Sequence, residues 1–276
     1  MNYKQKYKNL YQATSLSDYD ISSEIDFVIE MLTGLSSTDI LLGKQIEPSF
    51  DEKILEVLTE RVKTNRPIQQ ILGKAYFAGQ IYSVNENTLI PRPETEFLVD
   101  VCKKKFPKHK QISILDIGTG SGCIAIELAK YYINSKITAV DVCQATLDKA
   151  CENAQYYGVL DKINFVKSDV FSNLTGIFDM IVSNPPYIPF SMEIQKDVYD
   201  YEPHSALFAD DNGLYFYKKI ITEGKSFLNK NSFMAFEVGF NQGNEVMGLF
   251  EQNGYVNMLF TQDCDSINRV VSADFR

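Results

Sequence analysis

A proline-rich tetrapeptide, Asn184-Pro185-Pro186-Tyr187, carries groups that could hold a planar nitrogen. It directly follows an apolar stretch with the character of a strand, and two prolines cannot continue a central strand, so the chain must leave the sheet here. Proline also restricts the backbone and thereby aims the Asn184 side chain and the Pro185 carbonyl. Both oxygens can accept hydrogen bonds from one NH2 group, and Tyr187 can stack on that group. The alternative interpretation is an ordinary proline turn, which the glycine-rich loop described below disfavours.

The chemistry that such a group would serve is attack by a weak nucleophile. The nitrogen of an amide or of a ring-conjugated amine has a delocalised lone pair. Two acceptors can orient that nitrogen and stabilise the positive charge that develops on it, so most of the rate would come from positioning and electrostatic preorganisation. No separate strong base is required, because the product can lose its proton to water. The tetrapeptide therefore predicts transfer of a methyl group to a planar nitrogen, with Asn184, Pro185 and Tyr187 as the catalytic residues.

A glycine-rich stretch from Asp116 to Gly122 lies between a predicted strand and a predicted helix. Glycines permit a tight turn and a close approach of the backbone to a ligand. A dinucleotide fingerprint would read GxGxxG/A, with Cys123 at its last position, whereas the glycines here are spaced as GxGxG. A plain turn before a helix is the remaining interpretation.

Acidic residues at the ends of two neighbouring strands favour S-adenosyl-L-methionine, with S-adenosyl-L-homocysteine as its product. Asp141 ends the strand after the glycine loop, where a carboxylate can accept both hydroxyls of a ribose. Asp169 and Val170 follow the third strand and could border an adenine ring. An acidic surround also suits a sulfonium cation better than a pyrophosphate. The cofactor-binding residues predicted from these patterns are Gly118, Thr119, Gly120, Ser121, Gly122, Asp141, Asp169 and Val170, to which the family resemblance described below adds Asn184.

The elements that must position these residues alternate between strand and helix from Gln111 onward. Apolar runs of strand length are separated by segments with helical spacing, which predicts a doubly wound, mainly parallel sheet with right-handed crossovers. Ligands bind such α/β sheets at the carboxyl ends of the strands, near the point where the strand order reverses. The fold expected is a seven-stranded Rossmann-like methyltransferase sheet, with strands at 112–117, 136–141, 163–166, 178–183, 232–238, 255–260 and 268–272.

The first 72 residues show no strand pattern and are expected to form a small helical domain. Ile25, Val28 and Leu32 recur at helical spacing before Gly34, and residues 49–52 have the sequence of a capping box before a second helix. Residues 73–91 are predicted to form a hairpin linker, and 92–276 the methyltransferase domain.

The composition narrows the possible partners and location. The 276 residues carry a net charge of -9, with 27 basic and 36 acidic residues, which argues against binding to free nucleic acid. No secretory signal or membrane span is expected, and an odd number of cysteines, five, without a CxxC motif fits a reducing, cytoplasmic compartment. Two histidines and no CxxC motif predict no metal site. We expect a monomer.

At its motifs the chain resembles the bacterial release factor glutamine methyltransferases. The likeness covers nearly the whole sequence and includes residues 89–96 (LIPRPETE), the glycine loop, NPPY and the Phe236-Glu237-Val238-Gly239 segment. NPPY also occurs in DNA adenine and ribosomal RNA methyltransferases, whereas the PRPETE signature is far more specific. Gln70, Tyr76 and Val170 depart from residues common in the family, and none of the three lies in the tetrapeptide.

The resemblance implies a substrate and a partner. The family methylates the side-chain nitrogen (N5) of the glutamine in the Gly-Gly-Gln motif of class 1 peptide chain release factors. By that likeness the helical domain would dock the release factor. The residues implied to hold the glutamine are Asn184, Pro185, Pro186, Tyr187, Arg92 and Glu94. Pro93 and Thr95 are implied to shape the same pocket, with a polar contact between Arg92 and Glu94 closing it.

Three other functions are compatible with parts of the sequence. A DNA or RNA amino-methyltransferase acting on adenine or guanine would share NPPY, but the acidic charge and the single basic cluster, 103–110, argue against it. A non-catalytic cofactor-binding protein is disfavoured by the intact Asn184 and Pro185. A nicotinamide dehydrogenase would need the full dinucleotide fingerprint.

Overall fold

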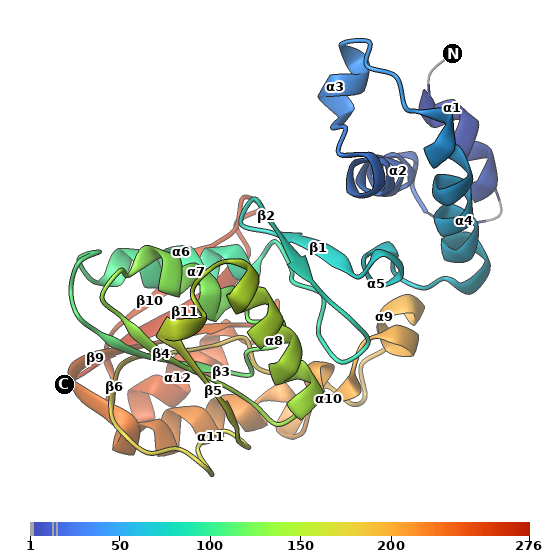
Figure 1. The fold of residues 1–276 in the computed structure, drawn as a ribbon. Coiled ribbons are helices and arrows are strands. Elements are labelled where there is room, and N and C mark those ends of the chain that lie inside the picture. The colour runs from blue at the N-terminus through green and yellow to red at the C-terminus, as the bar shows by residue number, and fades with distance from the viewer. Residues whose placement is uncertain (1–2, 13, 15) are drawn as a thin grey trace. The chain divides into compact units, whose positions relative to one another are not determined.

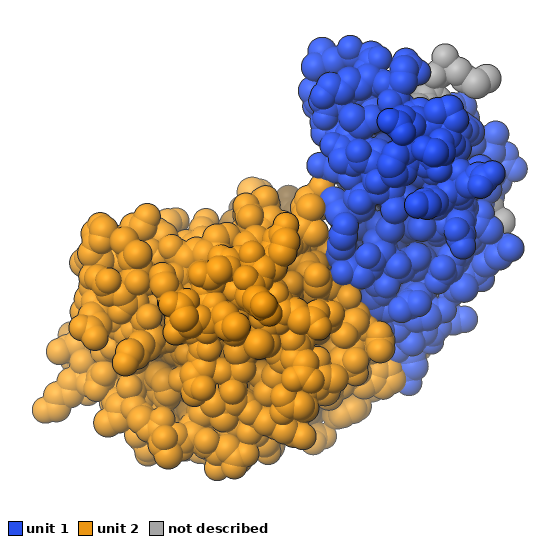
Figure 2. Space-filling view, in the orientation of Figure 1, with its two compact units in different colours: residues 1–74, 194–201 blue, residues 75–193, 202–276 orange. Residues whose placement is uncertain are grey.

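The computed structural model describes residues 3–12, 14 and 16–276, and these form two compact units. Unit 1 comprises residues 1–74 and 194–201, and unit 2 comprises residues 75–193 and 202–276 (Figure 2). Unit 1 thus includes residues 194–201, which were expected to belong to the methyltransferase domain. Residues 1, 2, 13 and 15 of the predicted helical domain lie outside the described part of the chain. No helix among the described residues is long and apolar enough to cross a membrane.

Unit 1 is helical, as the sequence predicts. Its core contains the predicted Ile25 and Val28, together with Leu58, Tyr7 and Tyr11. Ser17 caps the helix α2 (Asp18–Thr33) by accepting a hydrogen bond from the Asp20 backbone N–H. The elements of unit 1 are α1 (Tyr3–Lys8), η1 (Asn9–Tyr11), α2 (Asp18–Thr33), α3 (Ser37–Leu41), α4 (Pro48–Thr64), α5 (Ile68–Leu72) and α9 (Lys196–Tyr201).

The predicted capping box at residues 49–52 is wrong. Helix α4 begins at Pro48 with Glu47 as its N-cap, so Ser49 lies inside the first turn. Proline suits the first helical position, because its missing N–H would have no partner there and its φ is already helical. A capping box forms instead before α3, where Ser36 and Asp39 exchange side-chain to backbone hydrogen bonds.

Hydrogen bonds inside unit 1 hold the segment 194–201. The Tyr201 hydroxyl donates to the Thr64 carbonyl at 2.6 Å, and the Gln70 Nε2 donates to the Tyr201 carbonyl at 2.8 Å. The buried Arg61 donates to Glu24 at 2.9 Å and lies 3.7 Å from Asp197. The chain therefore leaves unit 2 shortly after NPPY, is fastened in unit 1, and returns at residue 202.

Unit 2 begins with the hairpin of β1 (Lys74–Phe77) and β2 (Gln80–Ser83), whose first residue still belongs to unit 1. Ala78 and Gly79 make its turn with φ values of 51° and 70°, the left-handed conformation that tight hairpin turns require. Asn85 and Thr88 close a separate turn that follows. Backbone groups of the hairpin are bound by side chains of two helices, Glu96 of α6 and Asn153 of α8.

The seven-stranded sheet of unit 2 confirms the predicted fold class (Figure 1). Its strand order is β10-β11-β9-β6-β3-β4-β5, and only β11 runs antiparallel to its neighbours. The strands are β3 (Ser113–Ile117), β4 (Lys136–Asp141), β5 (Ile163–Lys167), β6 (Phe178–Ser183), β9 (Leu228–Glu237), β10 (Val256–Gln262) and β11 (Asn268–Phe275). A short parallel pair, β7 (Ile188–Pro189) and β8 (Phe208–Ala209), lies outside this sheet.

Helices cover both faces of the sheet because successive strand residues point to opposite sides. Ile114 packs with residues of α6, α7 and α8, whereas the next residue, Leu115, packs with residues of α11 and α12. This is the doubly wound arrangement. The helical elements of unit 2 are α6 (Thr95–Lys105), α7 (Cys123–Tyr131), α8 (Gln144–Tyr156), η2 (Leu160–Lys162), α10 (His204–Leu207), η3 (Asp211–Gly213), α11 (Tyr215–Gly224), η4 (Lys225–Phe227) and α12 (Gly243–Gln252).

The backbone of NPPY packs against Gly213. Gly213 has a φ of +83°, and a Cβ placed on it would lie 2.0 Å from the Tyr187 carbonyl oxygen. The Gln242 Nε2 donates to the same carbonyl at 2.9 Å. Only glycine therefore allows this close approach, which fixes the end of the tetrapeptide.

We expect Gly213→Ala to lower the free energy of unfolding by about 2–4 kcal/mol, because a left-handed strain of about 1–2 kcal/mol is added to a backbone clash. Gly158→Ala is the matched control. Gly158 has a φ of +66°, and no atom of the described residues would lie within 4 Å of its Cβ. Urea unfolding followed by circular dichroism should show the larger loss for Gly213→Ala, and equal losses would contradict the packing argument.

Candidate active site

Five parallel strands end level with one another at one edge of the sheet. The pairs Ile117–Val140, Ile117–Ser183 and Ser183–Phe236 lie opposite each other in the register. The residue after each of these positions is therefore brought to the same edge. Those residues are Gly118, Asp141, Asn184 and Glu237, with Lys167 at the end of β5. The strand order reverses at β3, which is where a ligand site is expected in such a sheet.

The glycine loop is held by the strand end beside it. Backbone N–H groups of Gly118 and Thr119 donate to the Val140 carbonyl at 2.9 Å, and the Gly120 N–H donates to the Asp141 carboxylate at 3.2 Å. A Cβ on Gly122 would lie 3.0 Å from the Ala150 side chain of α8. The loop is thus shaped both for close packing and for presenting its backbone to the cavity.

Two predicted cofactor-binding side chains point into the protein rather than into a cavity. The buried Thr119 hydroxyl donates to the Asp116 carboxyl at 2.6 Å, and Ser121 is also buried. Burial raises the pKa of Asp116 to about 7. Their side chains support the loop.

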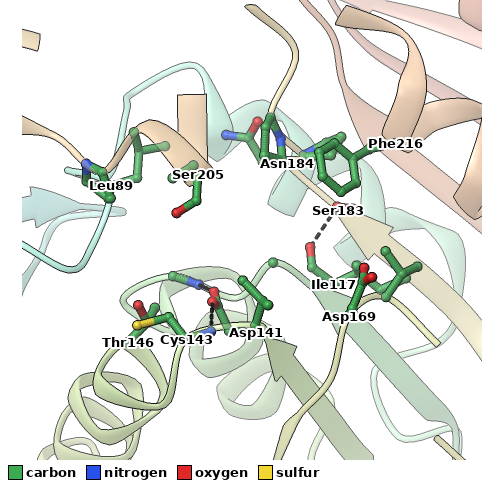
Figure 3. Close-up of a pocket in the computed structure, with 18 of the residues that line it drawn as sticks. Leu89, Ile117, Asp141, Cys143, Thr146, Asp169, Ser183, Asn184, Ser205 and Phe216 are labelled. Carbon is green, nitrogen blue, oxygen red and sulfur yellow. Dashed lines mark hydrogen bonds between the residues drawn. The ribbon is translucent and has the colours of Figure 1, made fainter. Parts of the chain in front are cut away.

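A cavity of about 380 Å³ lies at the level strand ends, entirely within unit 2 (Figure 3). In this view Asn184 and Asp141 lie on opposite sides of it. Of the predicted residues, those that line it are Gly118, Gly120, Asp141, Asp169, Val170, Asn184, Pro185 and Pro186. Thr119, Ser121, Gly122, Tyr187, Arg92 and Glu94 lie outside its lining.

Apolar residues make up much of the remaining wall. They are accompanied by the Cys143 and Thr146 side chains at the start of α8, which Figure 3 shows beside Asp141. These wall residues were not predicted as site residues. Leu89 and Ile117 lie inside quoted motifs, whereas Cys143 and Thr146 lie in none. The additional apolar lining residues are Leu89, Ile117, Val142, Ala206, Phe208, Phe216 and Ile220.

The two acidic residues predicted to bind a cofactor have different surroundings. Asp141 is held by backbone donors, including the Cys143 N–H at 3.0 Å, while burial raises its pKa. Asp169 is largely exposed and lies 3.0 Å from the Lys219 ammonium. Val170 is buried and has a φ of +52°, which is unusual for a β-branched residue and turns its backbone at the cavity wall.

The Asn184 side chain is joined to a buried carboxyl group through a hydroxyl. Its Nδ2 donates to the Thr95 Oγ1 at 3.1 Å, and that hydroxyl donates to the Glu237 Oε2 at 2.6 Å. The Tyr187 hydroxyl reaches the other Glu237 oxygen at 3.5 Å. Burial is the main cause that raises the pKa of Glu237 to about 7.

Arg92 and Glu94 are not joined by the predicted polar contact. Arg92 forms its ion pair with the buried Glu202, which also accepts a hydrogen bond from the Ile90 N–H at 3.1 Å. Glu94 lies 3.8 Å from Arg269. The segment around PRPE is thus held by the residue at which the chain returns from unit 1.

Glu202, Glu237 and Gln242 have clear contacts at the site but were not predicted as site residues. Thr95 was expected to shape the substrate pocket, but its contacts to Asn184 and Glu237 were not foreseen. Glu237 had a usable signal, since it is an acidic residue at the carboxyl end of a buried apolar run, like Asp116 and Asp141. The partners of Thr95 and Glu202 are distant in sequence and left no such signal. Among the described residues, no cluster of three or more His, Cys, Asp or Glu side chains could hold a metal ion.

The fold and this site together define a methyltransferase of the Rossmann-like class. The sheet order, a glycine loop after β3 and an Asn-Pro-Pro-Tyr loop after the adjacent β6 are its defining features. A protein-family model described as the methyltransferase small domain matches residues 93–199.

The chain belongs to the family of release factor glutamine methyltransferases. The protein of that name from Flavobacterium psychrophilum is 38% identical over 275 residues, which cover 96% of this chain and 95% of that protein. The one from Francisella tularensis is 38% identical and covers 93% and 91%, respectively. A solved methyltransferase from Pyrococcus furiosus shares the fold, with a TM-score of 0.54, 19% identity, and coverage of 78% of this chain and 95% of that one. The resemblance seen in the motifs is confirmed.

The raised pKa of Glu237 predicts a pH-dependent stability. Its protonated form stabilises the folded state fully below its ordinary value of 4.5, and this contribution is lost as the pH rises through about 7. The loss should be on the order of 3 kcal/mol. Between pH 5 and pH 7.5 the free energy of unfolding, measured with urea, should fall in the wild type. In Glu237→Gln, whose amide does not ionise, the fall should be smaller by about the amount that Glu237 contributes. The same pH dependence in both proteins would contradict the assignment.

Proposed function

We propose that the protein transfers a methyl group from S-adenosyl-L-methionine to the side-chain amide nitrogen of the glutamine in the Gly-Gly-Gln motif of class 1 peptide chain release factors. Full-length relatives bearing that family name support the substrate. The observation that carries the chemistry is the Asn184 carboxamide, whose Nδ2 is already engaged by Thr95. Its Oδ1 is the atom left to accept from a substrate N–H.

The cavity fits the proposed cofactor. Its volume of about 380 Å³ lies in the range of about 300–1,000 Å³ that small-molecule sites occupy. Asp141, at the end of the strand after the glycine loop, would accept the ribose hydroxyls, and Asp169 with Val170 would border the adenine. The apolar side chains of the cavity wall would cover the remaining surface of the cofactor. When bound, S-adenosyl-L-methionine supplies an electrophilic methyl group on sulfur and leaves as S-adenosyl-L-homocysteine.

The residues of NPPY would orient the substrate amide. The Asn184 Oδ1 and the Pro185 carbonyl would accept the two N–H bonds of the glutamine NH2 group, and both lie at the cavity wall. As the new N–C bond forms, positive charge develops on the nitrogen, and these two oxygens stabilise it. The nitrogen then loses one proton to water. Tyr187, held through its carbonyl by Gln242, would lie against the planar amide.

Recognition of the release factor is assigned to the helical unit. Three large apolar side chains of this unit are strongly exposed: Tyr19 of α2 is 79% exposed, and the consecutive Leu41 and Leu42 at the end of α3 are 82% and 80% exposed. Exposed apolar groups of this kind are suited to a protein partner. The net charge of -9 also favours a protein over free nucleic acid.

The experiment that tests the function offers the protein two substrates. Labelled S-adenosyl-L-methionine is incubated with a purified class 1 release factor and, separately, with RNA. We expect one added methyl on the Gly-Gly-Gln glutamine, located by mass spectrometry. Label found in RNA alone would replace this proposal with a nucleic-acid amino-methyltransferase.

Asn184→Ala should reduce methyl transfer at least about 100-fold, because one of the two acceptors for the developing charge is lost. Single-turnover assays with saturating cofactor give the rate, and circular dichroism should show an unchanged fold. Unchanged turnover would contradict the mechanism.

Asp141→Ala should weaken S-adenosyl-L-methionine binding about 10- to 100-fold, since removing a hydrogen-bonded charged partner costs roughly 1.5–3 kcal/mol. Asp148→Ala is the matched control, because Asp148 lies on α8 and accepts only from the Gln144 side chain at 2.9 Å among the hydrogen bonds found in the described residues. Isothermal titration calorimetry measures both dissociation constants. Equal affinities for the two variants would remove Asp141 from the cofactor site.

A further inference from the structure

Glu237 is a buried carboxyl group whose side-chain partners are two hydroxyls. It is 2% exposed, and within the described part of the chain no cation lies within the 4.0 Å of an ion pair. Arg269, the basic group of its surroundings, pairs with Asp263 and Glu94 instead. Burying a carboxyl group without a counter-ion is costly. Its side chain binds Thr95 and Tyr187, which both lie at the NPPY loop.

The direction of these hydrogen bonds can be worked out from the groups themselves. Above its pKa of about 7 the ionised Glu237 carboxylate can only accept, so the single hydrogen of the Thr95 hydroxyl points to the Glu237 Oε2 at 2.6 Å. The same hydroxyl oxygen can then only accept from its other neighbour, Asn184. The atom of Asn184 that can donate is Nδ2, which is the atom found 3.1 Å away. The carboxyl group thus determines which end of the Asn184 amide faces Thr95.

We propose that Thr95 and Glu237 are positioning residues that fix the orientation of the Asn184 carboxamide. In this orientation the Oδ1 is the end presented to the substrate, and the chain of donors runs from Asn184 through Thr95 to Glu237. If the amide were turned over, Nδ2 would meet the N–H groups of the substrate, and two donors would face each other. The identity of the group that donates to the Asn184 Oδ1, the glutamine amide of the substrate, rests on the proposed function.

The three residues come from elements that the fold holds rigidly. Asn184 follows β6 and Glu237 ends β9, and these strands are paired in register at Ser183 and Phe236. Thr95 is the first residue of α6. The backbone of β9 is fastened on its far side as well, since the Tyr217 hydroxyl donates to the Glu237 carbonyl at 2.9 Å. A fixed acceptor of this kind loses little freedom when the substrate binds, which favours rate rather than affinity.

The test compares Thr95→Val with Thr95→Ser. Valine keeps the shape of threonine but has no hydroxyl, so the Asn184 amide is free to turn, and we expect kcat for methylation of a release factor to fall about 10- to 100-fold. Serine keeps the hydroxyl and should restore most of that loss. The dissociation constant for S-adenosyl-L-methionine should stay within about threefold in both variants, because the glycine loop, Asp141 and Asp169 are untouched. Ser135→Ala, which removes a buried hydroxyl bonded to the Tyr132 carbonyl, controls for loss of a buried hydroxyl elsewhere.

A second readout does not depend on methyl transfer. In ¹⁵N-labelled protein, the side-chain NH2 signal of Asn184, assigned by its absence in Asn184→Ala, should exchange slowly with solvent in the wild type and in Thr95→Ser. It should exchange rapidly in Thr95→Val. If the NH2 signal shows these exchange rates but the wild type methylates no release factor, the proposed function is refuted and the positioning role stands. Wild-type kcat in Thr95→Val, or an unchanged Asn184 signal, would overturn the positioning role.

Glu237→Leu extends the test to the carboxyl group. If the two residues act as one unit, the double variant Thr95→Val/Glu237→Leu should lose no more kcat than the worse single variant. Losses that multiply would show two independent effects and contradict the proposal for Glu237. Where Glu237→Leu does not fold, Glu237→Gln replaces it. Its remaining oxygen can still accept from Thr95, so slow exchange of the Asn184 signal should persist, and rapid exchange would contradict the proposal.

Discussion

The site depends on the register of the parallel strands. Because β4, β3, β6 and β9 end level, the residue that follows each strand arrives at one edge of the sheet. These residues are an aspartate, a glycine, an asparagine and a glutamate. Shifting one strand by a single position would turn its side chains to the other face. The buried faces of the sheet therefore specify the geometry of the chemistry at its edge.

Two carboxyl groups show what this arrangement costs and what it provides. Asp116 and Glu237 are both buried in unit 2, and burial raises the pKa of each to about 7. Each accepts a hydrogen bond of 2.6 Å from a threonine hydroxyl, Asp116 from Thr119 and Glu237 from Thr95. One pair supports the glycine loop and the other supports the Asn184 amide. Buried carboxyls thus support both the glycine loop and the Asn184 side chain, which line the same cavity.

The chain between NPPY and Glu202 links the site to the helical unit. Residues 194–201 are fastened inside unit 1 by Arg61, Thr64 and Gln70. At Glu202 the chain returns to unit 2 and pairs there with Arg92 of the PRPE segment. Residues on both sides of this excursion, Pro186 before it and Pro203 after it, line the cavity. The part of the chain assigned to release-factor recognition is thereby connected in sequence to the cavity wall.

Local signals in the sequence were sufficient for the fold and for the backbone of the site. The alternation of apolar strands and helices predicted all seven strands, and the glycine loop, Asp141 and NPPY follow strands whose ends must meet in a parallel sheet. A local signal also misled, since the capping box expected at Ser49 gives way to a helix that starts at Pro48. Proline at the first helical position outweighed the serine pattern.

What only the tertiary structure decided is the partner of each polar side chain. Thr119 and Ser121 stand in the cofactor motif yet point into the protein, and Arg92 pairs with Glu202, 110 positions away, rather than with Glu94. Periodicity reports which face of an element is buried, but a hydrogen bond between distant segments leaves no trace in either segment. The sequence by itself therefore determined the sheet and the residues brought to its edge, while packing between elements decided which way the Asn184 amide points.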